Sequence, residues 1–161
     1  MTPSRRASPR RVADEQGQRD VPAGRPAWMR RFAFPAASAS VPAARHQVEE
    51  LGLQAGLRGN DLFELVLAVG EGLSNAVKHG SPRGERDTVT VAVSCYRDEL
   101  SVEIVDEGPG MLSSPLHQPG ATSSEGRGIH VMRDLTDDIR FECDGGTHVR
   151  LVKAIPRLRA R

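Results

Sequence analysis

Glu71 and Asn75 lie four residues apart in a segment whose apolar pattern predicts a helix, so their side chains project from the same face. Glu64, Ala68 and His79 continue this row, which we call the polar row, at spacings of three or four residues. An amide oxygen such as that of Asn75 is a good ligand for Mg²⁺, and a carboxylate one turn away can accept a proton or orient water. A solvated polar face has the same pattern, so this helix alone leaves both interpretations open.

Asp106 is a second candidate, because it ends a predicted strand and is followed by Gly108 and Gly110. It continues the alternation of Val102 and Ile104, which places its carboxylate on the buried face, where it needs hydrogen-bond donors. The exocyclic amine of adenine is one such donor, and the two glycines leave room for a flat base against the backbone. The competing interpretation is an ordinary turn, in which aspartate is a common residue.

Two further motifs contain glycine. The segment 126–128, Gly-Arg-Gly, stands directly before a predicted helix, whose N-terminal N–H groups could bind a phosphate. It lacks the Lys-Ser/Thr of a P-loop and no βαβ unit surrounds it, so neither P-loop nor Rossmann binding is indicated. Near the C-terminus, Thr147 follows Gly146 and shares the alternation of the last apolar strand, so its hydroxyl is expected on the buried side.

The elements that position these residues follow from periodicity and turn residues. An apolar stripe predicts one long helix from about residue 60 to 79, capped by Asn60 or Asp61, and Ser40 can cap an earlier helix that runs to about Leu51. Strands are expected near 30–34, 88–96, 100–105, 139–143 and 149–151, a third helix over 128–136, and a long loop over 107–127. This order predicts an α+β fold, a two-layer α/β sandwich whose mostly antiparallel sheet has helices on one face.

The composition fits one globular domain with basic extensions. The chain has 161 residues, a net charge of +1, 38% hydrophobic and 27% charged residues. No run approaches the roughly 18 apolar residues of a membrane helix, and no apolar stretch follows the first arginines, so we expect a cytoplasmic protein without membrane contact. We divide it into a disordered basic tail (1–28), a domain (29–155) and a short basic tail (156–161). Cys95 and Cys143 are expected to be buried, reduced thiols.

Taken together, Glu-x-x-x-Asn on a helix, Asp-x-Gly-x-Gly after a strand, Gly-x-Gly before a helix and a terminal Gly-Thr resemble the GHKL (histidine kinase-like) ATPase superfamily. Within it, the chain looks most like the anti-sigma factor serine/threonine-protein kinases. That closer match is carried by Phe34-Pro35, by the sequence VPAAR at 41–45 and by AVGEGLSNAVKHG at 68–80. The resemblance covers about residues 30–153 and implies the Bergerat ATP-binding fold.

The resemblance implies roles for individual residues. Asn75 would coordinate the Mg²⁺ that bridges the phosphates of ATP, Glu71 would be the catalytic residue that activates the attacking hydroxyl, and residues 111–125 would form a lid. The expected ATP contacts are Asn75, Lys78, His79, Asp106, Gly108, Gly110, Met111, Gly126, Arg127, Gly128, Ile129 and Thr147. The chain departs from related kinases at 123–125, where Ser-Ser-Glu replaces a basic residue. Arg127 either does that work or faces solvent.

The resemblance also implies partners. Such kinases bind a sigma factor, phosphorylate an antagonist protein on Ser or Thr, and often form homodimers through the first helix and the strand before it. The alternative is a non-catalytic module that senses ATP and sequesters a partner. A sensor histidine kinase fragment is disfavoured because no helix pair with a phosphorylatable histidine precedes the domain. Direct binding of nucleic acid is not expected, because the net charge is only +1 and we interpret the arginines of the tail as a solvated extension.

Overall fold

Alternating apolar residues produce one sheet of five strands, each antiparallel to its neighbours, in the order β1-β2-β3-β5-β4. The computed structural model describes residues 24–109, 124–143 and 145–157, with 124–126 described by their backbone only. The strands are β1 (Trp28–Pro35), β2 (Thr88–Cys95), β3 (Glu99–Val105), β4 (Asp138–Cys143) and β5 (Thr147–Ala154). The helices are α1 (Ser40–Ala55), α2 (Gly59–Lys78) and α3 (Ser124–Leu135), with a short 3-10 helix, η1 (Gly84–Arg86).

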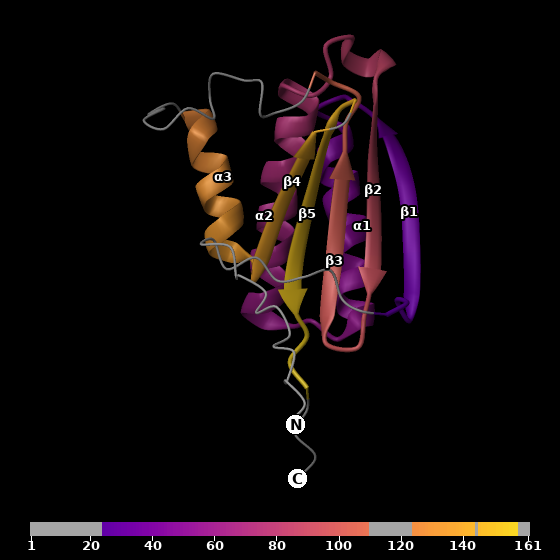
Figure 1. Cartoon of the computed structure of the whole chain (residues 1–161), viewed down its shortest axis with the longest axis vertical. Helices are drawn as coiled ribbons and strands as arrows, with labels where there is room; N and C mark the ends of the chain where they lie inside the picture. Colours follow the sequence, from indigo (N-terminus) through magenta and orange to yellow (C-terminus); the bar gives the residue numbers. More distant parts are fainter. Residues whose placement is uncertain (1–23, 110–123, 144, 158–161) are drawn as a thin grey trace, which may run out of the picture.

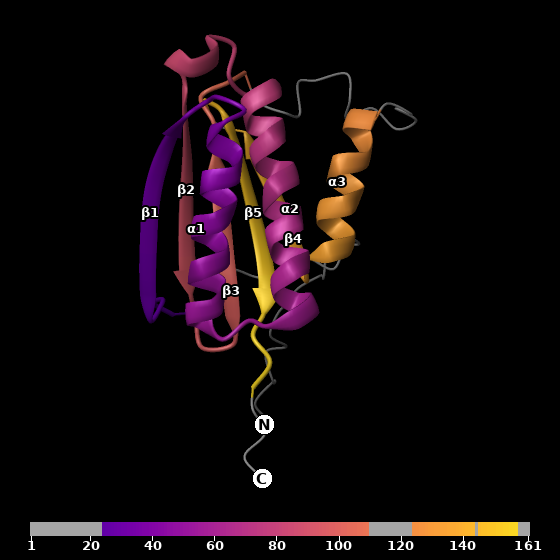
Figure 2. The ribbon, with the colours of Figure 1, turned by 180° about the vertical axis from the view of Figure 1, so that it is seen from behind.

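The helices lie on one side of the sheet. Helices α1 and α2 cover its face, and α3 lies beside α2 (Figure 1 and Figure 2). This arrangement confirms the predicted α+β sandwich. The strand β1 is an edge strand that pairs only with β2, as its short length and closing proline predicted.

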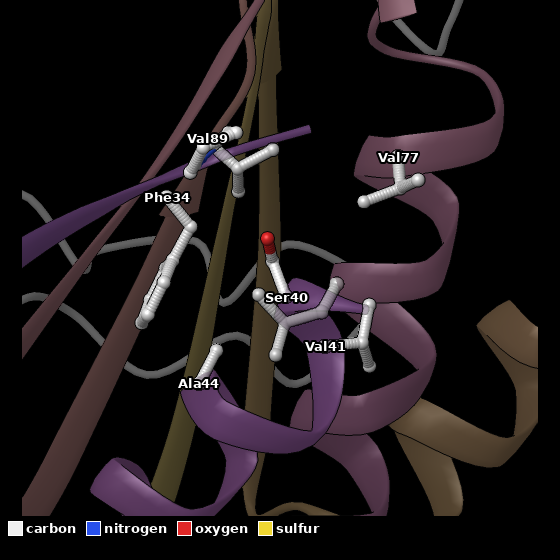
Figure 3. Close-up of a pocket in the computed structure, with 8 residues that line it drawn as sticks. Phe34, Ser40, Val41, Ala44, Val77 and Val89 are labelled. Carbon is white, nitrogen blue, oxygen red and sulfur yellow. The ribbon is translucent and has the colours of Figure 1, made fainter. Parts of the chain in front are cut away.

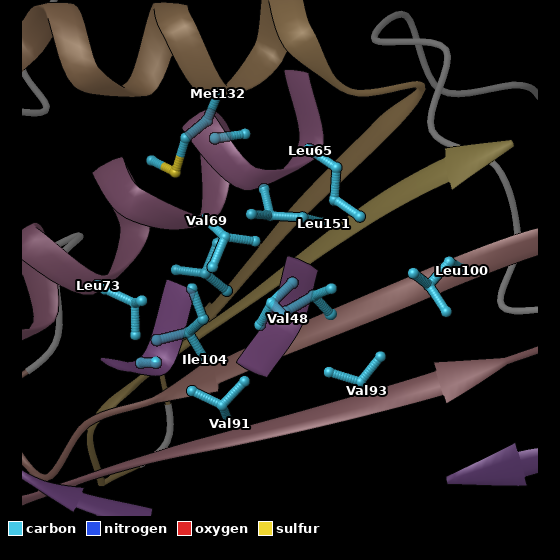
Figure 4. Close-up of a cluster of buried hydrophobic side chains, with 14 of the residues drawn as sticks. Val48, Leu65, Val69, Leu73, Val91, Val93, Leu100, Ile104, Met132 and Leu151 are labelled. Carbon is cyan, nitrogen blue, oxygen red and sulfur yellow. The ribbon is translucent and has the colours of Figure 1, made fainter. Parts of the chain in front are cut away.

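The core fills the space between the sheet and the helices α1 and α2 (Figure 4). Alternation in β2 and β3 and the apolar stripe of α2 point their side chains into the same layer. Register brings Val93 opposite Val102 and Val91 opposite Ile104, so the two strands present one continuous apolar surface. Side chains in this layer are almost completely buried; examples are Val48, Leu65, Val69, Val91, Val93, Leu100, Val102, Ile104 and Leu151.

The predicted helix caps were wrong. The N-cap of α2 is Arg58 and that of α1 is Ala39, and neither helix has a side-chain cap hydrogen bond. Asn60 and Asp61 therefore lie inside the first turn of α2. Gly59, the first residue of α2, adopts a φ of +55°, which glycine tolerates without steric cost. Helix α1 also continues past the predicted residue 51 and ends at Ala55, with Gly56 as its C-cap at a φ of +103°.

The two cysteines differ in environment. Cys95 is buried, and burial raises the pKa of its thiol. Cys143 is exposed, so the prediction of two buried thiols was wrong for this residue. The reason is its position, since it is the last residue of β4 at the edge of the sheet. Among the described helices, none is long and apolar enough to cross a membrane.

Candidate functional site

The polar row of α2 faces the first turns of α3. A Cβ atom placed on Gly128 would lie 3.0 Å from Oε2 of Glu71 and 3.7 Å from Nδ2 of Asn75. Glycine at this position therefore lets the backbone of α3 approach the two polar side chains closely. Two motifs that are more than 50 residues apart in sequence come together at this point.

Asn75 has an unsatisfied buried group. Its Nδ2 is buried and has no hydrogen-bond partner among the described residues. An orphaned buried amide is rare in a folded protein and indicates a missing ligand or ion. The amide oxygen and nitrogen exchange places by a simple flip, so the same side chain can present an acceptor there. An amide oxygen is a ligand type that Mg²⁺ accepts, so the chemistry of this side chain fits that ion. Within the described part of the chain, this site included, no group of three or more His, Cys, Asp or Glu side chains could hold a metal, so the protein would supply Asn75 alone as a ligand.

Asp106 directly follows β3, and its side chain is only 6% exposed, as the strand alternation predicted. Its Oδ1 accepts hydrogen bonds from the N–H groups of Gly108 and Thr147, both at 3.0 Å. Burial raises the pKa of this carboxyl, the two N–H donors counteract the rise, and the nearby charge of Asp87 adds to it. The result is a fixed acceptor held in an environment that disfavours its negative charge. Thr147 is buried, as expected.

Three glycines enclose Asp106. A Cβ on Gly80 would overlap the carboxylate of Asp106, and a Cβ on Gly146 would overlap its backbone carbonyl. A Cβ on Gly108 would lie 2.5 Å from the carbonyl oxygen of Gly80. The sequence predicted that Gly108 leaves room for a base, but the space where its Cβ would lie is filled by the backbone at the end of α2. Gly110 and Met111 lie outside the described residues.

The start of α3 corrects another expectation. The helix begins at Ser124, so Gly126 and Arg127 lie within its first turns and do not precede it. Only the first turn has N–H groups free for an anion, and Gly128 lies beyond it. Glycine has poor helix propensity, which is why the sequence predicted a later start. Tertiary packing overrides this, because Met132 of the same helix is completely buried. Arg127 is exposed, and Ile129 packs against the core.

The remaining predicted residues lie at the end of α2. Lys78 is exposed, and His79 is the C-cap, whose N–H donates to the carbonyl of Asn75 at 2.8 Å. Sequence reasoning used Gly80 only as a helix stop and missed its contact with Asp106. It also missed Asp87, which is 1% exposed and accepts a hydrogen bond from the N–H of Arg83 at 2.8 Å. Gly80 has no signal in local sequence, because its contact is with a distant segment, whereas Asp87 is held by Arg83 only four residues earlier.

Two pockets among the described residues lie away from this site. The first is an apolar cavity of about 10 Å³ between β1, α1, α2 and β2, which has room for no more than a water molecule (Figure 3). The second is an open pocket of about 250 Å³ lined by Ser38, Val41, Pro42, Ser74, Val77 and Lys78. Ser74 and Lys78 face α1 there, whereas Glu71 and Asn75 face α3. The two sides of α2 are therefore distinct surfaces.

Comparison with known proteins finds one domain family that matches most of the chain. Residues 34–153 match the model of the histidine kinase-like ATPase domain. The chain is 28% identical over 110 residues to the serine-protein kinase RsbW of Bacillus licheniformis, covering 62% of this chain and 69% of that protein. It is 28% identical over 132 residues to the serine-protein kinase RsbW of Listeria innocua serovar 6a, covering 76% and 84%.

A solved structure supports the fold. The structure of the RsbU and RsbW domains of Rv1364c from Mycobacterium tuberculosis superimposes with a TM-score of 0.63 at 20% identity, covering 81% of this chain and 33% of that one. The family model over residues 34–153 confirms the histidine kinase-like resemblance drawn from the sequence motifs. Since the family model spans 120 of the 161 residues, this protein belongs to the histidine kinase-like ATPase domain family.

Proposed function

We propose that this protein is an ATP-dependent serine/threonine-protein kinase that binds Mg-ATP beside α2 and α3. The observation that carries the proposal is the meeting of Glu71 and Asn75 with Gly128 at one place. It is supported by membership of an ATPase domain family and by relatives named serine-protein kinases. The chemistry is that of phosphoryl transfer, in which positioning and charge supply most of the catalysis.

In this proposal, each end of ATP has its own residues. Asp106 accepts a hydrogen bond from the exocyclic amine of adenine while Gly108 and Thr147 hold its other oxygen in place. Asn75 would hold Mg²⁺, which when bound would supply positive charge beside the phosphates. The free N–H groups in the first turn of α3, around Gly126, face the phosphates. His79, Gly110, Met111, Arg127 and Ile129 complete the proposed set of contacts, and Lys78, which lines the pocket on the α1 side of α2, is left out of it.

The transfer step uses Glu71. The hydroxyl oxygen of an acceptor serine or threonine forms a bond to the γ-phosphorus, and the bond from that phosphorus to the β–γ bridging oxygen breaks. ADP leaves with the electron pair, and the hydroxyl proton passes to the carboxylate of Glu71. Glu71 is half-buried and lies one helical turn from Asn75, which supports this role.

The proposed partners follow from the family resemblance. The protein would bind a sigma factor and would also phosphorylate an antagonist protein on Ser or Thr. It would regulate transcription in this way by exchanging one binding partner for the other. A homodimer through β1 and α1 is part of this proposal. It is supported by β1 being an edge strand whose outer N–H and C=O groups can pair with another chain. We place this activity in the cytoplasm.

Glu71→Ala tests the kinase. Transfer of labelled phosphate from ATP to a cognate antagonist should fall by about 10²–10⁴-fold, because the proton acceptor is removed. Calorimetry should show nearly unchanged Mg-ATP affinity. Glu85→Ala is the matched control, since Glu85 is an exposed carboxylate in η1. Unchanged transfer in Glu71→Ala would remove the base role.

A non-catalytic ATP-sensing module that sequesters a partner is the second candidate. One observation favours it: the backbone of α3 at Gly128 lies directly against the Glu71 carboxylate, so a hydroxyl has little room there. Nucleotide binding by the wild-type chain with no phosphate transfer to any candidate antagonist would support this function over the kinase.

A further inference from the structure

Lys153 contacts residues of both α2 and α3 from the strand β5, away from the residues proposed to bind ATP. It lies on β5, and its side chain is only 7% exposed. Its Nζ donates to Oε2 of Glu64 at 2.5 Å and to the carbonyl of Leu135 at 3.1 Å, and lies 3.8 Å from Oδ1 of Asp61. The ammonium group therefore connects the sheet to the first turns of α2 and to the last residue of α3.

The partners of Lys153 explain why the sequence tolerates a buried charge. An ammonium removed from water is costly unless it is paired and hydrogen-bonded. Glu64 supplies the opposite charge, and the carbonyl of Leu135 supplies an acceptor at the negative end of α3. The last carbonyls of a helix have no partner within it, so this bond also satisfies α3.

The polar row of α2 contacts α3 at both ends of that helix. Glu64 meets the last turn of α3 through Lys153, and Glu71 and Asn75 meet Gly128. Gly128 and Leu135 are seven residues apart, which is about 10 Å along a helix. A helix of this length moves as a rigid unit. Fixing its last turn therefore fixes where its first turns lie over Glu71 and Asn75.

We propose that Lys153 is a positioning residue that sets the place of α3 against the site on α2. The inference rests on the proposed function, because it assigns the first turn of α3 to the phosphates. A shift of about 1 Å in a catalytic arrangement can cost about 10²-fold in rate. Asp106 lies outside α3, so the adenine contact remains when α3 shifts. Loss of Lys153 therefore lowers phosphate transfer much more than affinity for ATP.

Three variants test this in the full chain. Lys153→Met removes the ammonium and keeps the side-chain length, Lys153→Arg keeps the charge, and Lys153→Met/Glu64→Gln also removes the carboxylate that would lose its partner. In Lys153→Met without nucleotide, amide hydrogen exchange in residues 129–135 should become about tenfold faster or more, because a hydrogen bond from a charged donor is lost. Transfer should fall by up to about 10²-fold. Lys153→Arg should keep both the exchange rate and the phosphate transfer close to those of the wild type.

The double variant separates positioning from stability. Its melting temperature should return towards that of the wild type, because the Glu64 carboxylate that lost its partner is also removed and the nearby Asp61 carboxylate is 43% exposed to water, whereas transfer should stay low. Recovery of transfer together with stability would overturn the proposal, and so would unchanged exchange in α3 of Lys153→Met. If the wild-type chain binds no Mg-ATP, the proposed function is what fails. In that case, faster exchange in the variant still supports the tether and unchanged exchange refutes it.

Discussion

Replacing Asp106 by asparagine exchanges one oxygen of the proposed adenine site for an NH₂ group. In the protein, Oδ1 of Asp106 accepts the N–H groups of Gly108 and Thr147, both at 3.0 Å. An asparagine Oδ1 can keep both bonds, so the local backbone should be preserved. The NH₂ group would then stand where Oδ2 stood. The variant therefore alters what this position offers a ligand with little change in shape.

The exchange should weaken ATP binding by about 1–3 kcal/mol, because the adenine amine is a donor and would meet another donor. That range corresponds to about 5- to 150-fold in the dissociation constant, measured by calorimetry with Mg-ATP. Asp138→Asn is the matched control, since Asp138 is also a buried aspartate but lies on β4. A loss smaller than about 1 kcal/mol, or an equal loss in the control, would refute adenine recognition by Asp106.

The same variant should change how stability depends on pH. Burial raises the pKa of Asp106 above its usual value of 3.8, so the folded chain holds this proton more tightly than the unfolded chain. Stability contributed by the protonated carboxyl is therefore present at low pH and decreases as pH rises through the raised pKa. The substituted asparagine side chain cannot ionise, so thermal unfolding of the variant should lack this decrease. Melting curves with the same pH dependence in both proteins would contradict burial as the cause.

Two other predictions concern packing and thiol reactivity. Gly70→Ala should stabilise the protein by about 0.5–1 kcal/mol, because alanine favours a helix and only a flexible arginine side chain lies near. Gly72→Ala should be about 1–3 kcal/mol less stable than Gly70→Ala in denaturant titrations, because its Cβ would lie 2.8 Å from the buried Ile104 side chain. In the native protein, iodoacetamide should label exposed Cys143 and spare Cys95, whose thiolate is disfavoured by burial, and labelling of both before unfolding would contradict this.

The sheet and α2 could be predicted from sequence because their signals are local. In β2 and β3, apolar residues alternate strictly, and the register of Val93 against Val102 then follows from a short hairpin. Helix starts could not be placed as well. A serine at residue 40 or an asparagine at residue 60 is a good cap in isolation, but the caps are Ala39 and Arg58, one or two residues earlier.

The site could be predicted only in part, because only some of its features depend on local sequence. The buried direction of Asp106 follows from strand parity, which is a local property. What lies against Gly108 cannot be predicted from local sequence, because the atoms that fill this space belong to Gly80, 28 residues earlier. Glycine marks a close approach of some kind, but sequence does not say whether a ligand or another backbone makes it.

The polar row shows most clearly what sequence periodicity cannot predict. Its spacing left two interpretations, a solvated face or a reactive one, and the structure adds a third, a contact surface for another helix. Glu64 meets α3 through Lys153, while Glu71 and Asn75 meet it through Gly128. Periodicity states only that these side chains share a face. What lies against that face is set by α3, more than 50 residues later. The two ends of the polar row differ in whether their polar groups are paired. Glu64 is paired with Lys153, which indicates a structural role. The buried Nδ2 of Asn75 has no hydrogen-bond partner within the described parts of the chain, which is why we propose that this end binds the ligand.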